Sequence, residues 1–367
     1  MKSEIVIVGG GPAGSTAAKI LAEYGYKVTV IEKGPPGRNK VCGGGTSEGC
    51  IKNFPYVRDK VIHQTNYLTQ MYEDLEMTYK LKIYHVERHD FDTYLMELAK
   101  ESGAKIMYNT SVTEVDLNNR RVKLDNGEII PYEKIIGADG ASSIVALTMG
   151  RRYQMVPIVQ ANIITQESNS DTAYVYHYKE LMGYAWIFPK GIYSNVGLGG
   201  KSNGYVINEL WGRFKSSLRG NEKENVNTDK AWVIPYTEEP YRISKEHENA
   251  YLIGDAAGYV NAMTGEGIFF AMKSGEEIAK VIAGKMKYND FPSFYPKLMK
   301  IIQMAKDAEK DFKRDPDRAI RKAFENPKEN EKLIKYLFED MDEDIEVPRY
   351  SDEEKVNKYK QILKNLR

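Results

Sequence analysis

The most constraining feature of the sequence is a glycine-rich turn that separates a short apolar run from a helix-like segment. The apolar run covers residues 4–8, and the turn that follows reads Gly9-Gly10-Gly11-Pro12-Ala13-Gly14. A second apolar run at residues 28–31 ends at Glu32, 18 residues beyond Gly14. This order predicts a strand, turn, helix and strand of the parallel type that binds a dinucleotide.

Each glycine of the turn has its own expected role. Gly9 permits the tight turn, Gly11 lets the backbone approach a pyrophosphate, and Gly14 lets the helix pack closely on the strand. Glu32 ends the second strand, where a carboxylate can hold ribose hydroxyls. NAD and FAD both suit this unit, so the rest of the chain must separate them.

Length and composition bound the protein class. A chain of 367 residues is long enough for two or three structural units. Hydrophobic residues make up 42% and charged residues 28%, which is ordinary for a soluble globular protein. Lys plus Arg equals Asp plus Glu at 52 each, which removes the usual electrostatic case for a nucleic-acid partner.

Cysteine usage and hydropathy indicate the compartment. The two cysteines, Cys42 and Cys50, form neither a secreted disulfide framework nor a zinc site, which favours a reducing compartment. The N-terminus has no apolar segment of the signal-peptide kind. No window approaches the run of about 18 apolar residues that a spanning helix needs. We therefore expect a cytoplasmic protein, with any membrane contact peripheral on the inner face.

Patterning along the chain predicts a mixed α/β organisation. Residues 41–56 are glycine-rich and irregular, whereas 67–85 and 152–234 alternate in the manner of antiparallel strands. Helices are expected at 91–102, where Gly103 is the stop signal, and at 266–283. Beyond Lys285 the composition predicts several amphipathic helices.

Three more segments place polar groups where the cofactor is expected. Arg88 begins a helix, and its guanidinium could reach phosphates or nearby backbone. Asp139 and Asp255 each end a strand within small-residue turns. Gly267 and Ile268 open the long helix, whose N-terminal N–H groups and dipole favour an anionic ligand edge.

An aromatic strand carries the most specific pattern. Tyr184, Trp186 and Phe188 alternate along it and therefore point to one face of a sheet. Pro189 follows, and Gly197-Leu198-Gly199 comes after seven intervening residues. Such a face is either a wall for an apolar ligand or a packed core between sheets, and periodicity alone leaves both open.

The order of these motifs resembles the flavoprotein fold of para-hydroxybenzoate hydroxylase and, within it, the geranylgeranyl reductase family. The segments Lys40–Gly45, Gly254–Gly275 and Tyr184–Gly199 carry the closer resemblance, which covers about residues 1–285. The resemblance implies FAD as the cofactor. It also implies that the aromatic pattern lines a cavity for a prenyl chain.

The resemblance extends to individual residues of this sequence. The implied FAD contacts, with the fingerprint glycines, are Gly9, Gly11, Ala13, Gly14, Glu32, Cys42, Gly43, Gly45, Arg88, Val112, Asp255, Gly267 and Ile268, with Asp139 and Gly140 as weaker additions. The implied substrate contacts are Tyr184, Trp186, Phe188 and Pro189. Cys42 is also the candidate catalytic proton donor, and Cys50 is expected to be structural. No residue is assigned to a metal.

The implied architecture is a Rossmann-type FAD-binding domain, an antiparallel-sheet substrate domain and a helical C-terminal tail. We assign residues 1–60, 86–150 and 245–285 to the first, 61–85 and 151–244 to the second, and 286–367 to the third. The last region has no counterpart in the resemblance, and its helices are expected to help shape the substrate channel.

The implied activity is FAD-dependent reduction of geranylgeranyl double bonds, with an archaeal ether lipid as the first choice of substrate and a diphosphate or a quinone as the others. The electron donor is NADPH, a ferredoxin or another reduced carrier. A flavin monooxygenase acting on an aromatic ring shares the fold and is the alternative within enzymes. A flavin electron-transfer or binding protein without lipid turnover is the alternative outside them.

Overall fold

A computed structural model of the chain describes residues 4–218, 229–244 and 247–338. The described residues divide into two compact units. The first unit is drawn from Met1–Lys40, Arg88–Met155 and Ile234–Ile302, and the second from Val41–Glu87, Val156–Val233 and Gln303–Arg367. This division differs from the expected domain boundaries, because residues 41–60 group with the second unit and the C-terminal region is split inside a helix.

The first unit is built on a parallel sheet of five described strands in the order β16-β10-β1-β2-β6. β1 lies at the centre and pairs in parallel with β2 and β10, as the turn motif predicts. The strands are β1 (Glu4–Val8), β2 (Lys27–Ile31), β6 (Lys105–Met107), β10 (Lys134–Gly137) and β16 (Ala250–Leu252). The return of the chain to this sheet at Tyr251 is confirmed.

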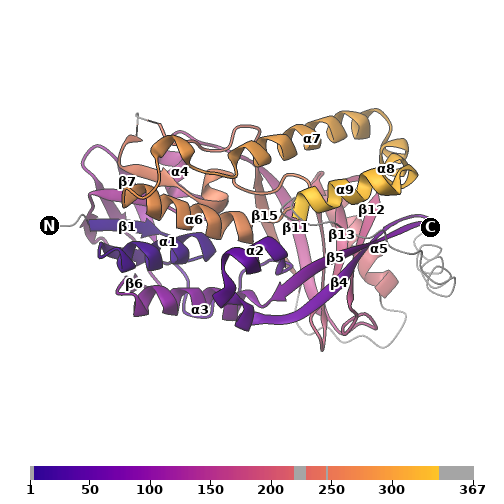
Figure 1. Ribbon diagram of the computed structural model, residues 1–367, viewed down its shortest axis with the longest axis horizontal. Helices are drawn as coiled ribbons and strands as arrows, with labels where there is room; N and C mark the ends of the chain where they lie inside the picture. Colours follow the sequence, from indigo (N-terminus) through magenta and orange to yellow (C-terminus); the bar gives the residue numbers. More distant parts are fainter. Residues whose placement is uncertain (1–3, 219–228, 245–246, 339–367) are drawn as a thin grey trace. The chain divides into compact units, whose positions relative to one another are not determined.

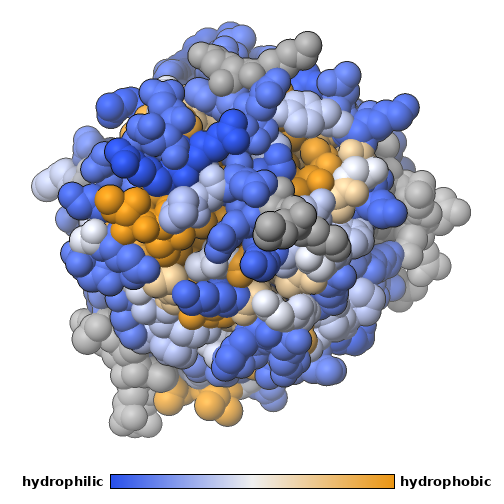
Figure 2. All heavy atoms as spheres, turned by 90° about the vertical axis from the view of Figure 1, so that its left-hand side faces the viewer, coloured by the Kyte–Doolittle hydropathy of each residue, from blue (hydrophilic) through white to orange (hydrophobic). Residues whose placement is uncertain are grey.

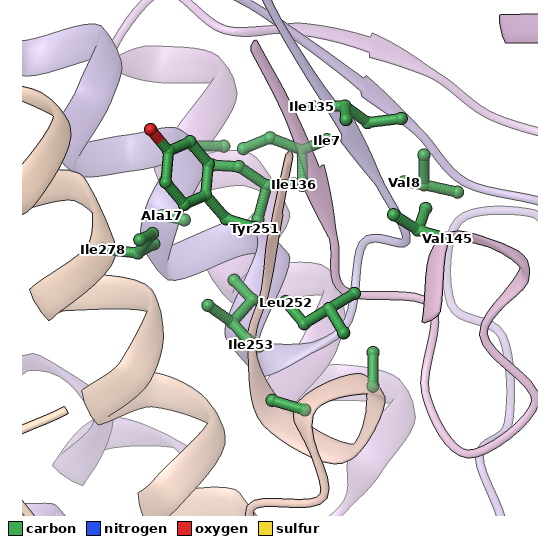
Figure 3. Packing of buried hydrophobic residues seen from close by; sticks show 14 of the residues in the cluster. Ile7, Val8, Ala17, Ile135, Ile136, Val145, Tyr251, Leu252, Ile253 and Ile278 are labelled. Carbon is green, nitrogen blue, oxygen red and sulfur yellow. The ribbon is translucent and has the colours of Figure 1, made fainter. Parts of the chain in front are cut away.

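Three helices pack together in the first unit. α1 (Pro12–Glu23) contacts both α3 (Arg88–Glu101) and α6 (Ile268–Ile282), and it lies between them in Figure 1. The expected helices at 91–102 and 266–283 are thereby confirmed within a few residues. Figure 3 shows how Ile7 and Ile136 of the strands, Ala17 of α1 and Ile278 of α6 meet in one apolar core.

Smaller elements complete the first unit. They are the antiparallel sheet β7 (Val112–Asp116), β8 (Arg121–Leu124) and β9 (Ile129–Pro131), the short helix α4 (Ile144–Thr148), and the 3-10 turns η3 (Gly254–Ala257) and η4 (Tyr288–Asp290). The turn at residues 125–127 joins β8 to β9.

The second unit is built on a sheet of eight described strands in the order β15-β11-β14-β13-β12-β4-β5-β3. Most neighbours are antiparallel, as the alternation predicts, but β4 and β12 run parallel. The strands are β3 (Gly45–Ser47), β4 (Val61–Tyr72), β5 (Leu75–Val86), β11 (Gln154–Ile163), β12 (Thr172–Tyr178), β13 (Leu181–Pro189), β14 (Ser194–Lys201) and β15 (Lys230–Tyr236).

Two expectations for the second unit were wrong in detail. Residues 41–56 are not irregular throughout, because β3 pairs with β5 and is followed by α2 (Glu48–Asn53) and the 3-10 turn η1 (Pro55–Lys60). The segment 152–234 also contains α5 (Gly204–Leu218) among its strands. α5 buries Leu210 and Phe214 against one face of the sheet, a long-range contact that strand alternation does not reveal.

The described C-terminal region is helical, as expected. It consists of α7 (Tyr295–Arg314), α8 (Pro316–Glu325) and α9 (Pro327–Phe338). Asp315 is the N-cap of α8, and its carboxylate accepts the N–H of Arg318. The rest of the predicted tail, residues 339–367, lies outside the described residues.

In the described part of the chain, no helix combines the length and the apolar character needed to cross a membrane. The face of the molecule shown in Figure 2 is mainly hydrophilic, with separate apolar patches between the polar side chains.

The contact between α1 and α6 yields a stability prediction. A Cβ on Gly275 would stand 2.4 Å from the carbonyl oxygen of Ala13. Gly275→Ala should therefore lower the free energy of unfolding by about 2 kcal/mol through overpacking. Gly212 of α5 has open space around it, so Gly212→Ala should instead raise stability by up to about 1 kcal/mol. Denaturant unfolding followed by circular dichroism measures both, and equal stabilities would contradict the packing argument.

Candidate functional site

The turn before α1 can be formed only by glycine at two of its positions. Gly9 has φ of 99°, and a Cβ there would lie 2.4 Å from the carbonyl oxygen of Ala138. A Cβ on Gly14 would lie 2.0 Å from the carbonyl oxygen of Gly9. Gly11 is different, because the nearest atom to its Cβ position belongs to the Arg38 side chain at 3.4 Å. The start of α1 is therefore packed tightly on the sheet side and open at Gly11, which fits the approach of a pyrophosphate.

Glu32 lies at the open side of this turn. Its side chain is buried, and its two carboxylate oxygens accept the backbone N–H groups of Gly10 and Gly34, each at 2.8 Å. Arg38 Nε lies 3.2 Å from the same carboxylate. These contacts fix the carboxylate where the sequence places the ribose of the cofactor.

Arg38 contacts the candidate site residue Glu32, and the sequence analysis missed it. Its guanidinium bridges Glu32 and Asp92, with Nη2 lying 3.2 Å from the Asp92 carboxylate. Arg88 makes a bidentate pair with Asp92, at 2.8 and 2.9 Å, one turn along α3. Two arginines and two acids thus alternate beside the turn. Only the fold reveals this arrangement, because residues 38 and 92 are far apart in sequence.

The start of α6 is brought to the start of α1. A Cβ on Gly254 would lie 3.0 Å from the Ala13 Cβ, and one on Gly267 would lie 3.2 Å from the Asp255 carboxylate. Gly267 is the N-cap of α6 and offers no side-chain cap, so the first N–H groups at Ile268 are not capped by that residue. Two helix N-termini and the Asp255 carboxylate therefore converge, which suits a cofactor with an anionic diphosphate and polar ribityl groups.

Asp139 has a local structural role. Its two oxygens accept the Ser143 hydroxyl at 2.5 Å and the Ile144 N–H at 2.7 Å, and Ser143 in turn caps α4. Burial raises the pKa of the Asp139 carboxyl, and the hydrogen bonds oppose that rise. Its assignment as a cofactor contact, like that of Gly140 beside it, stays a prediction.

Val112 begins β7 and pairs with Leu124. The Thr110 N–H donates to the Glu32 carbonyl oxygen at 3.1 Å, so the segment just before Val112 lies beside the end of β2. Its predicted contact with FAD remains a prediction.

Residues 42–45, which we call the Cys42 turn, belong to the second unit. The Gly44 N–H donates to Cys42 Sγ at 3.4 Å, and Cys42 is half-buried. A Cβ on Gly43 would lie 3.0 Å from the Phe188 ring and 3.3 Å from Trp186 Nε1, and one on Gly45 would lie 3.4 Å from Phe188. The glycines therefore let this turn lie directly on the aromatic residues. Cys50 is fully buried in α2.

The three predicted aromatic residues form one wall on the face of β13. The ring centroids of Tyr184 and Trp186 are 6.0 Å apart, as are those of Trp186 and Phe188. Trp186 lies over Gly197 on β14, where a Cβ would stand 2.1 Å from the indole. Only glycine leaves room at position 197 for the Trp186 ring that covers it. We call Tyr184, Trp186 and Phe188 the aromatic wall.

Polar and helical neighbours flank the aromatic wall. Trp186 Nε1 donates to Asn195 Oδ1 at 2.8 Å, which fixes the indole. Pro189 is buried where β13 turns into β14. Tyr184 and Phe188 also belong to an apolar cluster, which includes Phe324 of α8 and both Ile334 and Phe338 of α9. Helices α8 and α9 therefore pack onto the same cluster as the wall.

The predicted contacts come from both units. The fingerprint glycines, Ala13, Glu32, Arg88, Val112, Asp139, Asp255, Gly267 and Ile268 lie in the first unit, and Cys42, Gly43, Gly45 and the aromatic wall lie in the second. Among the described residues, no group of three or more His, Cys, Asp or Glu side chains is placed to hold a metal ion.

Glu32 provides a test of the cofactor site. Both of its oxygens accept N–H groups, so in Glu32→Gln the amide NH₂ must face a donor and the charge opposite Arg38 is lost. FAD affinity should fall about tenfold or more, which is about 1.4 kcal/mol or more. Titration of deflavinated protein with FAD measures this. The control is Glu23→Gln on α1, where the side chain is 47% exposed, and equal affinities for the two variants would contradict the assignment.

Several known proteins resemble this chain in sequence. Residues 3–181 match the family model described as pyridine nucleotide-disulphide oxidoreductase. The chain is 31% identical to an uncharacterized protein of Methanosarcina barkeri, over 79% of this chain and 77% of that protein. It is 28% identical to the digeranylgeranylglycerophospholipid reductase of Thermoplasma acidophilum, over 82% of this chain and 83% of that one.

A solved structure supports the fold. The geranylgeranyl bacteriochlorophyll reductase-like protein of Thermoplasma acidophilum superimposes with a TM-score of 0.68 at 24% identity, covering 100% of this chain and 98% of that one. With the motifs and the relatives taken together, the chain belongs to the geranylgeranyl reductase family of flavoproteins.

Proposed function

We propose that this protein is an FAD-dependent reductase that saturates the double bonds of geranylgeranyl chains. The observation that carries the proposal is the contact between the Cys42 turn and the aromatic wall, because Gly43 and Gly45 lie against Phe188. A thiol and an extended apolar surface are thereby held together. Reduction of an isolated alkene needs both a proton donor and a surface that binds a hydrocarbon.

The first unit holds the cofactor in this proposal. The open backbone at Gly11 faces the diphosphate, Glu32 holds the ribose, and Asp255 with the start of α6 binds the ribityl chain and the ring edge. When bound and reduced, FAD supplies the hydride for the reaction. The protein supplies binding, orientation and the proton.

The second unit binds the prenyl chain and protonates it. Tyr184 and Phe188 are half-buried, so part of each ring can contact a ligand. A polyprenyl chain offers almost only apolar surface, worth about 25 cal/mol for each Å² removed from water. Cys42 gives its thiol proton to the alkene carbon that does not receive the hydride.

An archaeal membrane ether lipid is our first choice of substrate, in line with the name of the Thermoplasma relative. Such a lipid lies in a bilayer, so we propose a cytoplasmic protein that docks transiently on the inner face of the membrane. The electron donor in this proposal is NADPH that binds transiently, a ferredoxin or another reduced carrier, since the one dinucleotide fingerprint of the sequence is assigned to FAD.

An anaerobic reduction assay tests the proposal. The purified holoprotein is reduced with dithionite and mixed with a geranylgeranylated lipid extract. Reoxidation of the flavin should accompany a mass gain of about 2 Da for each saturated double bond. Reoxidation that requires oxygen, with oxygen entering an aromatic compound, would instead establish a monooxygenase. Flavin that passes electrons to a carrier without changing the lipid would establish an electron-transfer protein.

The aromatic wall provides a second test. Tyr184→Ala removes a half-buried ring from the wall, so KM for the prenyl substrate should rise about tenfold while FAD content stays unchanged. Tyr205→Ala is the control, because Tyr205 lies in the same unit and is 77% exposed. Parallel loss of FAD and of substrate binding would identify Tyr184 as part of a packed core, the alternative that the sequence pattern left open.

A further inference from the structure

A buried lysine follows the aromatic strand directly. Lys190 comes after Pro189 at the end of β13, and its side chain is only 2% exposed. Lysine is rarely buried to this extent, because its ammonium loses hydration unless partners replace it. A lysine at this place therefore requires an explanation that packing alone does not supply.

Lys190 has partners at the end of β5 and directly after it. Its Nζ donates to the Val86 carbonyl oxygen at 2.6 Å and lies 3.4 Å from the Glu87 carboxylate. The Tyr193 hydroxyl donates to the same Glu87 oxygen at 2.5 Å. Glu87 is 20% exposed, so this network leads from the surface of the second unit to a buried ammonium.

The ammonium lies against the Cys42 turn. Gly44 has φ of 71°, and a Cβ there would stand 2.6 Å from Lys190 Nζ and 2.3 Å from the Val86 carbonyl oxygen. The Val86 N–H donates to the Gly44 carbonyl oxygen at 2.9 Å, and the Gly44 N–H donates to Cys42 Sγ. Gly44 therefore connects the thiol to the lysine through its backbone.

A neutral histidine lies on the same side. His85 pairs with Gly45 and is fully buried, and its ring centroid lies 5.5 Å from that of Phe188. Burial lowers the pKa of His85 well below its usual value, and Lys190 and His63 lower it further. Two ionisable groups near the turn are thus His85, whose neutral form is favoured, and Glu87, which is engaged by Lys190 and Tyr193. Lys190 Nζ is a cationic group that the structure holds against Gly44 of the turn.

We propose that Lys190 is a positioning residue for Cys42. It holds the Cys42–Gly45 turn on the aromatic wall through Val86, and its ammonium balances the negative charge that the sulfur acquires. The inference rests on the proposed function, in which Cys42 is the proton donor. In that step the S–H bond breaks, a C–H bond forms at the alkene carbon, and a thiolate remains. Water returns the proton to the half-buried sulfur.

Alkylation of Cys42 in the intact holoprotein tests the proposal without relying on turnover. The thiolate is the reacting species, and a neighbouring cation favours it. Lys190→Met should therefore slow modification of Cys42 by iodoacetamide about tenfold near neutral pH, as measured by mass spectrometry of the Cys42 peptide. With a prenyl substrate, the same variant should lose kcat about tenfold while KM stays within about twofold of the unmodified protein.

Matched variants separate charge from packing. Lys82→Met removes a lysine of the same unit whose side chain is 45% exposed and should leave alkylation unchanged. The double variant Glu87→Gln with Lys190→Met leaves no unpaired carboxylate, so it decides the question if the single variant fails to fold. Cys42→Ser identifies the peptide whose modification is followed.

An unchanged alkylation rate in folded Lys190→Met or in the double variant would overturn the role of Lys190. Absence of prenyl reduction by the unmodified protein would instead overturn the proposed function. The alkylation result would still decide whether Lys190 acts on Cys42, so the two failures are distinguishable.

Discussion

The first unit depends on the close approach of backbone to backbone at the start of α1. Gly14 lies so near to the Gly9 carbonyl, and Gly275 so near to the Ala13 carbonyl, that a single methyl group would fit at neither position. This contact lets β1, α1 and α6 share one apolar core (Figure 3). It also brings the N-terminus of α1, the N-terminus of α6 and the Glu32 carboxylate into one unit. The polar groups can therefore come together because glycine, which has no side chain, occupies these two positions.

Side chains of β13 in the second unit point alternately to the two faces of the sheet, and the two faces have different roles. Ala185 and Ile187 face the core under α5, so that side of the sheet is fully occupied. Tyr184, Trp186 and Phe188 face the other side, where glycines of β14 and of the Cys42 turn leave room for the rings. One strand can thus stabilise the fold with one face and present a ligand wall with the other.

Buried charge beside an apolar wall is the least ordinary feature of this unit. His85 lies in β5 and Lys190 directly follows β13, and the two buried groups differ in their partners. His85 is held neutral, whereas Lys190 keeps a carboxylate and a carbonyl as partners. This arrangement holds an ammonium group against Gly44 of the Cys42 turn, close to an apolar wall.

Local patterns in the sequence were sufficient to predict the fingerprint turn and the position of Glu32 after the second strand. They also predicted the alternation of the aromatic strand and most of the helices and strands. Each of these is encoded by neighbouring residues, through backbone angles that favour glycine or through the period of a strand. Only the tertiary structure decided that β12 runs parallel to β4, that residues 41–60 join the second unit, and that Arg38 and Lys190 belong to the candidate sites. Asp92, which pairs with Arg38, and Glu87, which pairs with Lys190, lie far from them in the sequence. A charged residue carries no local sign of burial until the fold brings such a counterpart to it.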